Sequence, residues 1–162
     1  MTAPNSALAI WHRLSPLPLG KWLFSRVVCF KAPYFGSISP HFEDLRPGRC
    51  EVRLRKRRAV TNHIGTVHAI AMCNLAELAA GTMIEATLPA THRWIPKGMT
   101  VEYLKKAATN LRGVAALEPL PDFAGPDFAR PCELPIPVTV TDTGGALVFR
   151  AIITMHVSPR KG

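Results

Sequence analysis

Apolar and polar residues alternate most clearly between residues 49 and 57. Cys50, Val52 and Leu54 share one parity, and the other parity is charged, with Arg49, Glu51, Arg53, Arg55 and Arg57. Successive side chains of a β-strand point to opposite faces of a sheet. The alternation therefore predicts a strand that has one buried face and one charged face.

A long apolar segment lies near the middle of the chain. Residues 66–83 are mostly Ala, Ile, Met, Leu and Cys on every side of a helix, which predicts a helix wrapped by other structure. The wider segment 64–84 has the length of a membrane span. However, the carboxylate of Glu77 is costly inside a bilayer, and Gly65 and Gly81 lie near the two ends as they do in helices of globular domains. We therefore expect a buried helix and no membrane insertion.

The rest of the pattern predicts strands and turns. Strand-like runs occupy residues 82–88, 99–104 and 113–120, and a β-hairpin is predicted from 136–141 and 146–157. The Pro-rich segment 119–137 is expected to form a surface loop. Consecutive strands with short turns imply an antiparallel sheet, and a single apolar helix implies that the sheet curls around it.

The N-terminal part has a different pattern. Residues 5–30 are amphipathic and are interrupted by the turn Leu17-Pro18-Leu19-Gly20. We expect residues 1–40 to form a helical cover and residues 41–160 to form a single globular domain. No basic segment precedes the first apolar run, so a cleavable signal peptide is not expected.

Composition narrows the picture further. The chain has 162 residues, 48% of them apolar, which suits one domain with a substantial core. Its net charge of +9 favours a polyanionic partner: a nucleic acid, an anionic membrane surface or a ligand that carries phosphates. The four cysteines are far apart and form no CxxC pair or Cys/His cluster. We therefore expect reduced thiols in a cytoplasmic protein and no metal site.

Three segments resemble one protein family. The run Asn-His-Ile-Gly-Thr-Val-His from Asn62 to His68, followed nine residues later by Glu77, resembles the central-helix motif of the hotdog-fold acyl-CoA thioesterases, in particular the phenylacetate-pathway and 4-hydroxybenzoyl-CoA branches. Residues 101–107 are similar to a strand of that family, and the final hairpin is similar too. The resemblance implies an α+β hotdog fold, in which a curved antiparallel sheet wraps around one long central helix, preceded here by an N-terminal helical extension.

The same resemblance implies an activity. A thioesterase of this kind hydrolyses the thioester of a fatty or aromatic acyl-CoA, with the coenzyme A thioester as substrate and no further cofactor. Its site residues correspond to Glu77 as base or nucleophile and to the backbone N–H of Ala69 as the group that polarises the carbonyl. Asn62 and His68 correspond to orienting groups.

The chain departs from the family pattern at the start of the helix. Where the family has His-Gly-Gly, this sequence has His68-Ala69-Ile70. Ala69 still offers its N–H at a helix N-terminus, where free amides favour a developing negative charge. The larger Ile70 narrows the acyl pocket or weakens catalysis. A non-catalytic module that binds acyl-CoA or another hydrophobic ligand therefore stays open as an alternative.

Helix geometry bears on assembly. His68 and Glu77 are nine residues apart, which is roughly 13 Å along a helix axis. One carbonyl group cannot contact both positions within one chain. We therefore expect the site to combine two subunits whose helices run antiparallel, in a homodimer or in a homotetramer built as a dimer of dimers.

Simpler roles stay open for the same residues. Glu77 can be a hydrogen-bonded carboxylate of the core, Asn62 a turn or N-cap residue, and His68 a histidine that only starts the helix. The arginines of the first strand either bind the phosphates of coenzyme A, for which Arg53, Arg55 and Arg57 are the candidates, or only face solvent. A nucleic-acid partner is not expected, because no aromatic residues accompany the basic strip.

Overall fold

The computed structural model describes residues 6–160, so residues 1–5 of the expected N-terminal cover lie outside the described part. The elements follow one another as α1 (Ser6–Leu14), α2 (Gly20–Lys31), η1 (Pro33–Ile38), β1 (His41–Arg46), β2 (Arg49–Leu54), η2 (Arg58–Val60), α3 (Ala69–Thr87), β3 (His92–Tyr103), β4 (Leu111–Ala116), η3 (Pro126–Phe128), β5 (Cys132–Thr141) and β6 (Leu147–Pro159). The elements marked η are short 3-10 helices.

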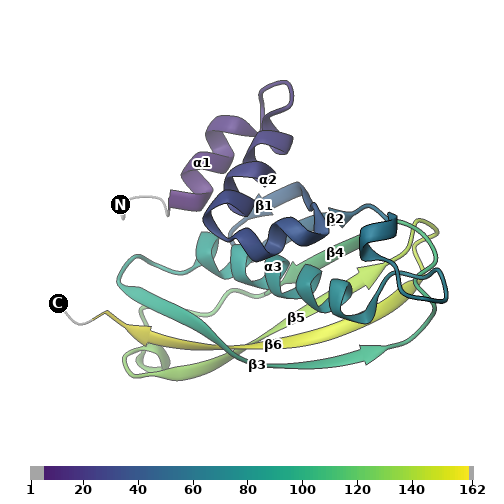
Figure 1. Ribbon diagram of the computed structural model, residues 1–162. Helices are drawn as coiled ribbons and strands as arrows, with labels where there is room; N and C mark the ends of the chain where they lie inside the picture. Colours follow the sequence, from purple (N-terminus) through teal and green to yellow (C-terminus); the bar gives the residue numbers. More distant parts are fainter. Residues whose placement is uncertain (1–5, 161–162) are drawn as a thin grey trace.

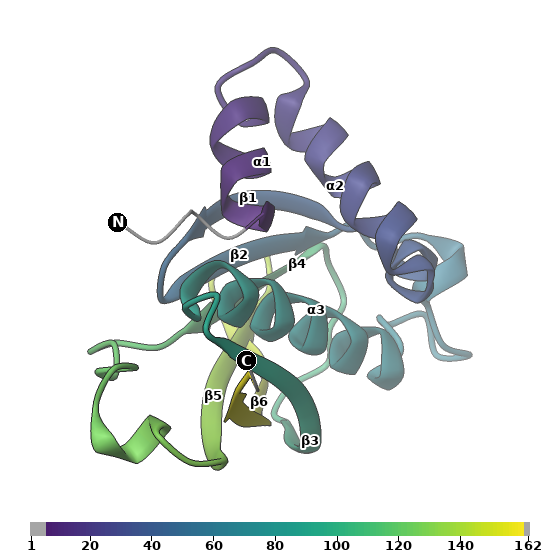
Figure 2. The same cartoon turned by 90° about the vertical axis from the view of Figure 1, so that its left-hand side faces the viewer.

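The strands form a single six-stranded sheet in the order β1-β2-β4-β5-β6-β3, and every pair of neighbours is antiparallel. α1 and α2 form a helical pair packed on α3 and β1 (Figure 1). The sheet curls around α3, with β1 and β2 on one side of the helix and β5, β6 and β3 on the other (Figure 2). The expected architecture, a curved antiparallel sheet around one long helix with an N-terminal helical extension, is confirmed.

The central helix α3 is buried as predicted but is shifted along the chain. Twelve of its 19 residues are buried, which explains why a helix with the length and apolarity of a membrane span belongs to the core of this domain. The strand expected at 82–88 is wrong, because Thr82, Met83 and Ile84 continue the helix as buried residues. β-branched residues disfavour helices only weakly, and burial in the core outweighs that preference.

The first two strands show where alternation succeeds and fails as a guide. In β2 the predicted buried face is confirmed, since Cys50, Val52 and Leu54 are all fully buried. β1 has no counterpart in the sequence prediction. Its alternation is broken by a register shift between Phe42 and Asp44, so the strand does not show a clean two-residue period.

Prolines explain two further differences from prediction. β3 begins at His92 rather than at residue 99, with a register shift between Pro96 and Gly98, and it lies at the edge of the sheet, where such irregularities are tolerated. The last part of the expected Pro-rich loop is in β5, which contains Pro135 and Pro137. Because β4 pairs with β5 only from Val138 onward, this part of β5 has one strand neighbour and can accommodate proline.

Aromatic packing attaches the N-terminal helices to the sheet. The rings of Trp11, Phe24 and Phe42 form two successive edge-to-face contacts with centroids 5.1 Å apart, which link α1 through α2 to β1. All three side chains are buried and belong to the same apolar cluster as α3. The Phe42 N–H also donates to the buried Ser25 hydroxyl of α2 at 3.0 Å. These contacts hold α2, and α1 through it, against β1.

Candidate active site

A short turn prepares the start of the central helix. The side-chain oxygen of Asn62 accepts hydrogen bonds from the N–H groups of Ile64 and Thr66 at 3.2 and 3.0 Å, and its amide donates to the Thr66 hydroxyl at 2.8 Å. Val67 then forms an isolated bridge with Thr61 and donates its N–H to the Ala107 carbonyl. The Asn62 side chain therefore makes its hydrogen bonds within this turn. This agrees with the simpler of its two expected roles, a turn residue, and not with the role of an orienting group for substrate.

His68 is the N-cap of α3. Its Nδ1 atom accepts a hydrogen bond from the Ile70 N–H at 3.1 Å, so the proton of the neutral ring is on Nε2. The ring itself is exposed, and Ala69 behind it is half-buried. The N–H of Ala69 belongs to the first helical turn, whose amides have no acceptor within the helix. The amide proposed to polarise a carbonyl is therefore presented at an accessible helix end.

Glu77 lies further along the same helix and is half-buried. It is eight residues from Ala69, which is roughly 12 Å along the axis. Within one chain the structure does not bring the Glu77 carboxylate and the Ala69 amide together. Glu77 instead lines a pocket of about 410 Å³ that lies between the N-terminal helices, α3 and β3.

Most of the pocket lining is apolar. It is formed by Ala7, Ile10, Phe24, Val27, Val28, Lys31, Ala32, Phe35, Glu77, Leu78, Gly81, Thr82, Glu85, Trp94 and Pro96. The Trp94 ring is held in place by its Nε1–H, which donates to the Glu85 carboxylate at 2.8 Å. A Cβ atom at Gly81 would lie 3.2 Å from this ring, so the absence of a side chain there lets the indole pack close to the helix.

A polar cluster joins η1 to α3 one turn before Glu77, and Asn74 is its buried member. Asn74 is 5% exposed and donates to the Ser37 hydroxyl of η1 at 3.1 Å, while its side-chain oxygen has no hydrogen-bond partner among the described residues. Arg57 donates to the Ser37 carbonyl at 2.8 Å and to the Ser39 hydroxyl at 3.1 Å. The cluster ties η1, which contributes Phe35 to the pocket, to the central helix.

Cys73 and Tyr103 meet on the other side of this helix turn. The Cys73 sulfur and the Tyr103 hydroxyl are 3.3 Å apart. The hydrogen bond with Cys73, together with partial burial, raises the pKa of Tyr103 to about 12. The neutral phenol is therefore the form present at physiological pH, and it can donate or accept a hydrogen bond near the start of α3.

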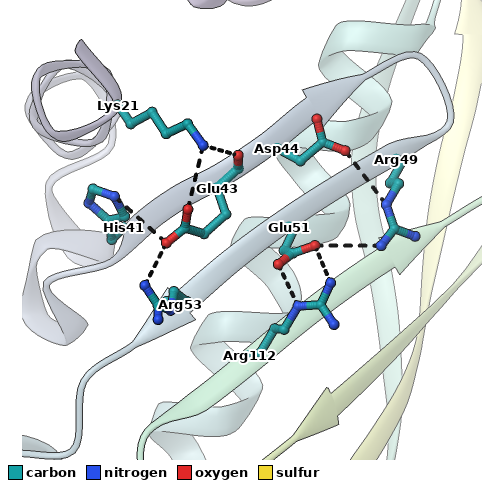
Figure 3. Close-up of polar contacts among 8 residues, drawn as sticks. All are labelled: Lys21, His41, Glu43, Asp44, Arg49, Glu51, Arg53 and Arg112. Carbon is teal, nitrogen blue, oxygen red and sulfur yellow. Dashed lines mark hydrogen bonds and ion pairs between the residues drawn. The ribbon is translucent and has the colours of Figure 1, made fainter. Parts of the chain in front are cut away.

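The charged face of β2 is an ion-pair network on the side of the sheet away from α3 (Figure 3). Arg112 forms a two-point contact with Glu51, which also accepts from Arg49 at 3.5 Å. Hydrogen bonding to Arg112, with help from Arg49, lowers the pKa of Glu51. Arg53 donates to Glu43 at 2.8 Å. Two candidates for coenzyme A phosphates are thus engaged within the chain: Arg53 here and Arg57 at η1.

The structure therefore separates the predicted site residues into groups. Asn62, His68 and Ala69 are together at the start of α3, Glu77 is in the pocket, and Arg53 is on the opposite face of the sheet. In residues 6–160 no group of three His, Cys, Asp or Glu side chains is placed to hold a metal ion. Sequence reasoning missed the pocket walls, including Trp94 and Glu85. The signal in the sequence is the short apolar repeat of α2, which by itself predicts only a helical cover.

Comparisons with known proteins agree with this architecture. Residues 20–157 match the family described as "Domain of unknown function (DUF4442)". A search of curated proteins found no match. The solved structural-genomics protein APC5556 is 47% identical, with 96% of this chain and 98% of that chain covered and a TM-score of 0.81.

Two further solved structures carry thioesterase names. PA5026 from Pseudomonas aeruginosa, described as a probable thioesterase, is 25% identical over 89% of this chain and 97% of its own, with a TM-score of 0.75. Zebrafish thioesterase superfamily member 2 is 16% identical over 83% of this chain and 93% of its own, with a TM-score of 0.67, and shares the fold. The chain therefore belongs to the DUF4442 family and has the hotdog fold of the thioesterase superfamily.

Proposed function

We propose that this protein is an acyl-CoA thioesterase in which Glu77 activates water or attacks the thioester. The position of Glu77 carries the proposal, since a half-buried carboxylate on the central helix borders a pocket whose lining is mainly apolar. Thioester hydrolysis needs a group that handles protons or attacks carbon beside a space that accepts an acyl group. The thioesterase name of the 25% identical PA5026 supports the same reaction class.

A homodimer completes the site in this proposal. β3 is a 12-residue strand at the edge of the sheet. Antiparallel pairing of two β3 strands around a two-fold axis would continue the sheet and set two α3 helices side by side in opposite directions. The Glu77 carboxylate of one subunit would then approach the Ala69 N–H of the other, which the roughly 12 Å along one helix prevents within a chain.

Two chemical routes satisfy this arrangement. In the first, Glu77 takes a proton from water as the water oxygen bonds to the thioester carbon, and the Ala69 N–H stabilises the carbonyl oxygen as it becomes negative. The C–S bond then breaks, and the thiolate of coenzyme A takes the proton from Glu77. In the second, a Glu77 oxygen bonds to the carbon and expels the thiolate, and water opens the resulting mixed anhydride.

Asn62 and His68 serve the Ala69 amide in both routes. Asn62 fixes the turn before the helix, and His68 caps its first turn, so the two side chains determine where the amide points. They act as positioning residues in this proposal. Loss of either side chain should therefore lower kcat more than it changes KM for the acyl-CoA, and His68→Asn, which keeps a capping acceptor, should retain more activity than His68→Ala.

The decisive experiment compares wild type with Glu77→Gln in a hydrolysis screen. Short, medium, long and aromatic acyl-CoAs are supplied, and release of free thiol is measured. We expect Glu77→Gln to lower kcat by about 10²–10⁴-fold, the usual contribution of a general base, while Glu118→Gln, which alters an exposed carboxylate outside the pocket, stays at the wild-type rate. Absence of turnover with every substrate would remove the enzymatic proposal, and full turnover by Glu77→Gln would remove the assignment of Glu77.

A non-catalytic acyl-CoA binding module is the second candidate. It is favoured by Ala69-Ile70 in place of two glycines, since Ile70 is 55% exposed at the helix end where the thioester would approach. Chain-length-dependent binding of acyl-CoA without any thiol release would establish it.

In the same proposal the phosphates of coenzyme A bind the arginines at the end of β2 and just after it, with Arg53, Arg55 and Arg57 as the candidates. Arg55 is exposed, so its reversal tests this without breaking the ion pair of Arg53. Arg55→Glu should raise KM several-fold at low salt and little at high salt, because exposed charges are screened. Arg130→Glu, an exposed arginine of the 119–131 loop, is the control. If Arg55→Glu and Arg130→Glu change KM equally, Arg55 only faces solvent and does not bind the phosphates.

A further inference from the structure

The pocket beside Glu77 has walls from two parts of the chain that are distant in sequence. α1 and α2 supply one side through Ala7, Ile10, Phe24, Val27 and Val28, and α3 and β3 supply the other through Leu78, Gly81, Trp94 and Pro96. The N-terminal helices therefore do more than cover the sheet. They close a space against the helix that carries the candidate catalytic residue.

The α3 wall of the pocket has a carboxylate at each end, Glu77 and Glu85, with mainly apolar groups between them. The Glu85 carboxylate is already engaged by the indole N–H of Trp94. Glu77 is thus the carboxylate available for chemistry. Beyond it, along α3, the lining passes Leu78 and Gly81 toward the Trp94 ring. A bound molecule with one reactive end and one apolar end fits this order of groups.

The length of the pocket can be estimated along α3. Glu77 and Glu85 are eight residues apart, which is roughly 12 Å along the helix axis. An extended carbon chain with C–C bonds of about 1.5 Å advances about 1.25 Å per carbon. The distance therefore corresponds to a chain of about eight to ten carbons.

The volume of the pocket is consistent with an acyl group of this length. The pocket measures about 410 Å³. An apolar protein cavity of about 150 Å³ is known to hold benzene, so this pocket has space for a ligand more than twice as large. A two-carbon acyl group would leave most of the apolar wall without contacts.

We propose that α1 and α2 form an acyl pocket with α3 and β3 that selects a medium-chain acyl group of about eight to ten carbons, with the thioester at Glu77 and the chain running past Gly81 to Trp94. This inference rests on the proposed thioesterase function and specifies its substrate. The N-terminal helical pair is then the part of the chain that sets chain length. Each methylene buried there strengthens binding about fourfold, until the chain reaches the end of the pocket.

The test is a chain-length profile measured by two independent methods on the full chain. Turnover of saturated acyl-CoAs from two to sixteen carbons gives kcat/KM, and calorimetry gives the Kd of the same series for Glu77→Gln, which does not consume the ligand. We expect both profiles to rise to a maximum at eight to ten carbons. The binding profile remains informative even if the protein hydrolyses nothing.

Variants of α2 connect the profile to this pocket. Val27→Trp fills space in the pocket and should move the maximum shorter by three or more carbons, with at least a tenfold loss for decanoyl-CoA. Val27→Ala enlarges the space and should extend the maximum toward longer chains, which covers the case in which the tryptophan variant does not fold. Leu23→Trp introduces the same side chain at an exposed position of α2 outside the pocket and should leave the profile unchanged.

The outcomes separate the two levels of inference. A binding maximum at eight to ten carbons that Val27→Trp shortens, without turnover, retains the pocket and removes the thioesterase. Turnover with a profile that Val27→Trp and Val27→Ala both leave unchanged overturns the pocket and retains the thioesterase. A flat profile, or an aromatic acyl-CoA bound more tightly than decanoyl-CoA, also overturns the medium-chain assignment.

Discussion

Replacing Ser25 with alanine removes a hydroxyl that joins α2 to the sheet. The side chain is fully buried, its O–H donates to the Lys21 carbonyl at 2.7 Å, and its oxygen accepts the Phe42 N–H at 3.0 Å. In the Ser25→Ala variant the Phe42 N–H remains buried and has lost its acceptor. The substitution changes one oxygen atom and leaves the packing of the neighbouring aromatic rings in place.

The magnitude follows from the cost of an unsatisfied donor. A buried N–H without a partner costs about 1–3 kcal/mol, whereas the bond between Ser25 and Lys21 is replaced at little cost because helix carbonyls also bond within the helix. We expect the free energy of unfolding to fall by about 2 kcal/mol. For a domain of this size that loss lowers Tm by about 4–8 °C.

Urea denaturation and amide hydrogen exchange check the expectation separately. Urea gives the change in unfolding free energy, with Ser15→Ala in the α1–α2 turn as a control that should stay within about 0.5 kcal/mol of wild type. Hydrogen exchange should accelerate at the Phe42 amide more than at amides of β6. A stability change below 0.5 kcal/mol together with unchanged exchange at Phe42 would show that this hydrogen bond does not hold α2 on the sheet.

Two further predictions concern titrating groups. Because Arg112 lowers the pKa of folded Glu51, the stability that this carboxylate provides is complete above its unfolded pKa of about 4.3 and is lost as the pH falls through the lower folded value. Glu51→Gln should therefore flatten the decline in stability between pH 5 and pH 3 in urea melts, whereas an unchanged decline relative to Glu118→Gln would refute the role of the pair. Tyr103 should ionise near pH 12 in an ultraviolet titration of a Tyr34→Phe background, and Cys73→Ala should move its pKa toward 10; an unchanged titration would show that Cys73 does not cause the shift.

The alternation of apolar residues and the long apolar segment correctly predicted β2 and the buried helix α3, whose hydrophobic patterns are regular. β2 and the buried character of α3 follow from patterns of two and 3.6 residues that a single chain displays by itself. The predicted ends of helices and strands are wrong where contacts with another part of the fold determine the local structure. Thr82 to Ile84 read as a strand by residue type but are helical because the core surrounds them. Pro135 is compatible with β5 only because β4 ends before reaching it, and that neighbour is not visible from local sequence.

The candidate site was predictable to a different extent. The motif from Asn62 to Glu77 located the helix start and the carboxylate, since a motif preserves the order and spacing of residues. The wall of the pocket could not be predicted in the same way, because Val27 and Trp94 are 67 positions apart and line one pocket only once the chain has folded. The partners of Arg53 and Arg57 were equally hidden, because they depend on β1 lying beside β2 and on η1 lying beside the segment that follows β2.

The chain of rings from Trp11 through Phe24 to Phe42 has a consequence for how this chain can be divided or transplanted. Because Phe42 is fully buried against Phe24, a fragment that begins at residue 41 would carry an open apolar surface on β1. Exchanging the first 40 residues between relatives would require a residue at position 42 that packs against the incoming helices. The N-terminal helices and β1 therefore form one packing unit, which extends across the boundary that the sequence pattern places at residue 40.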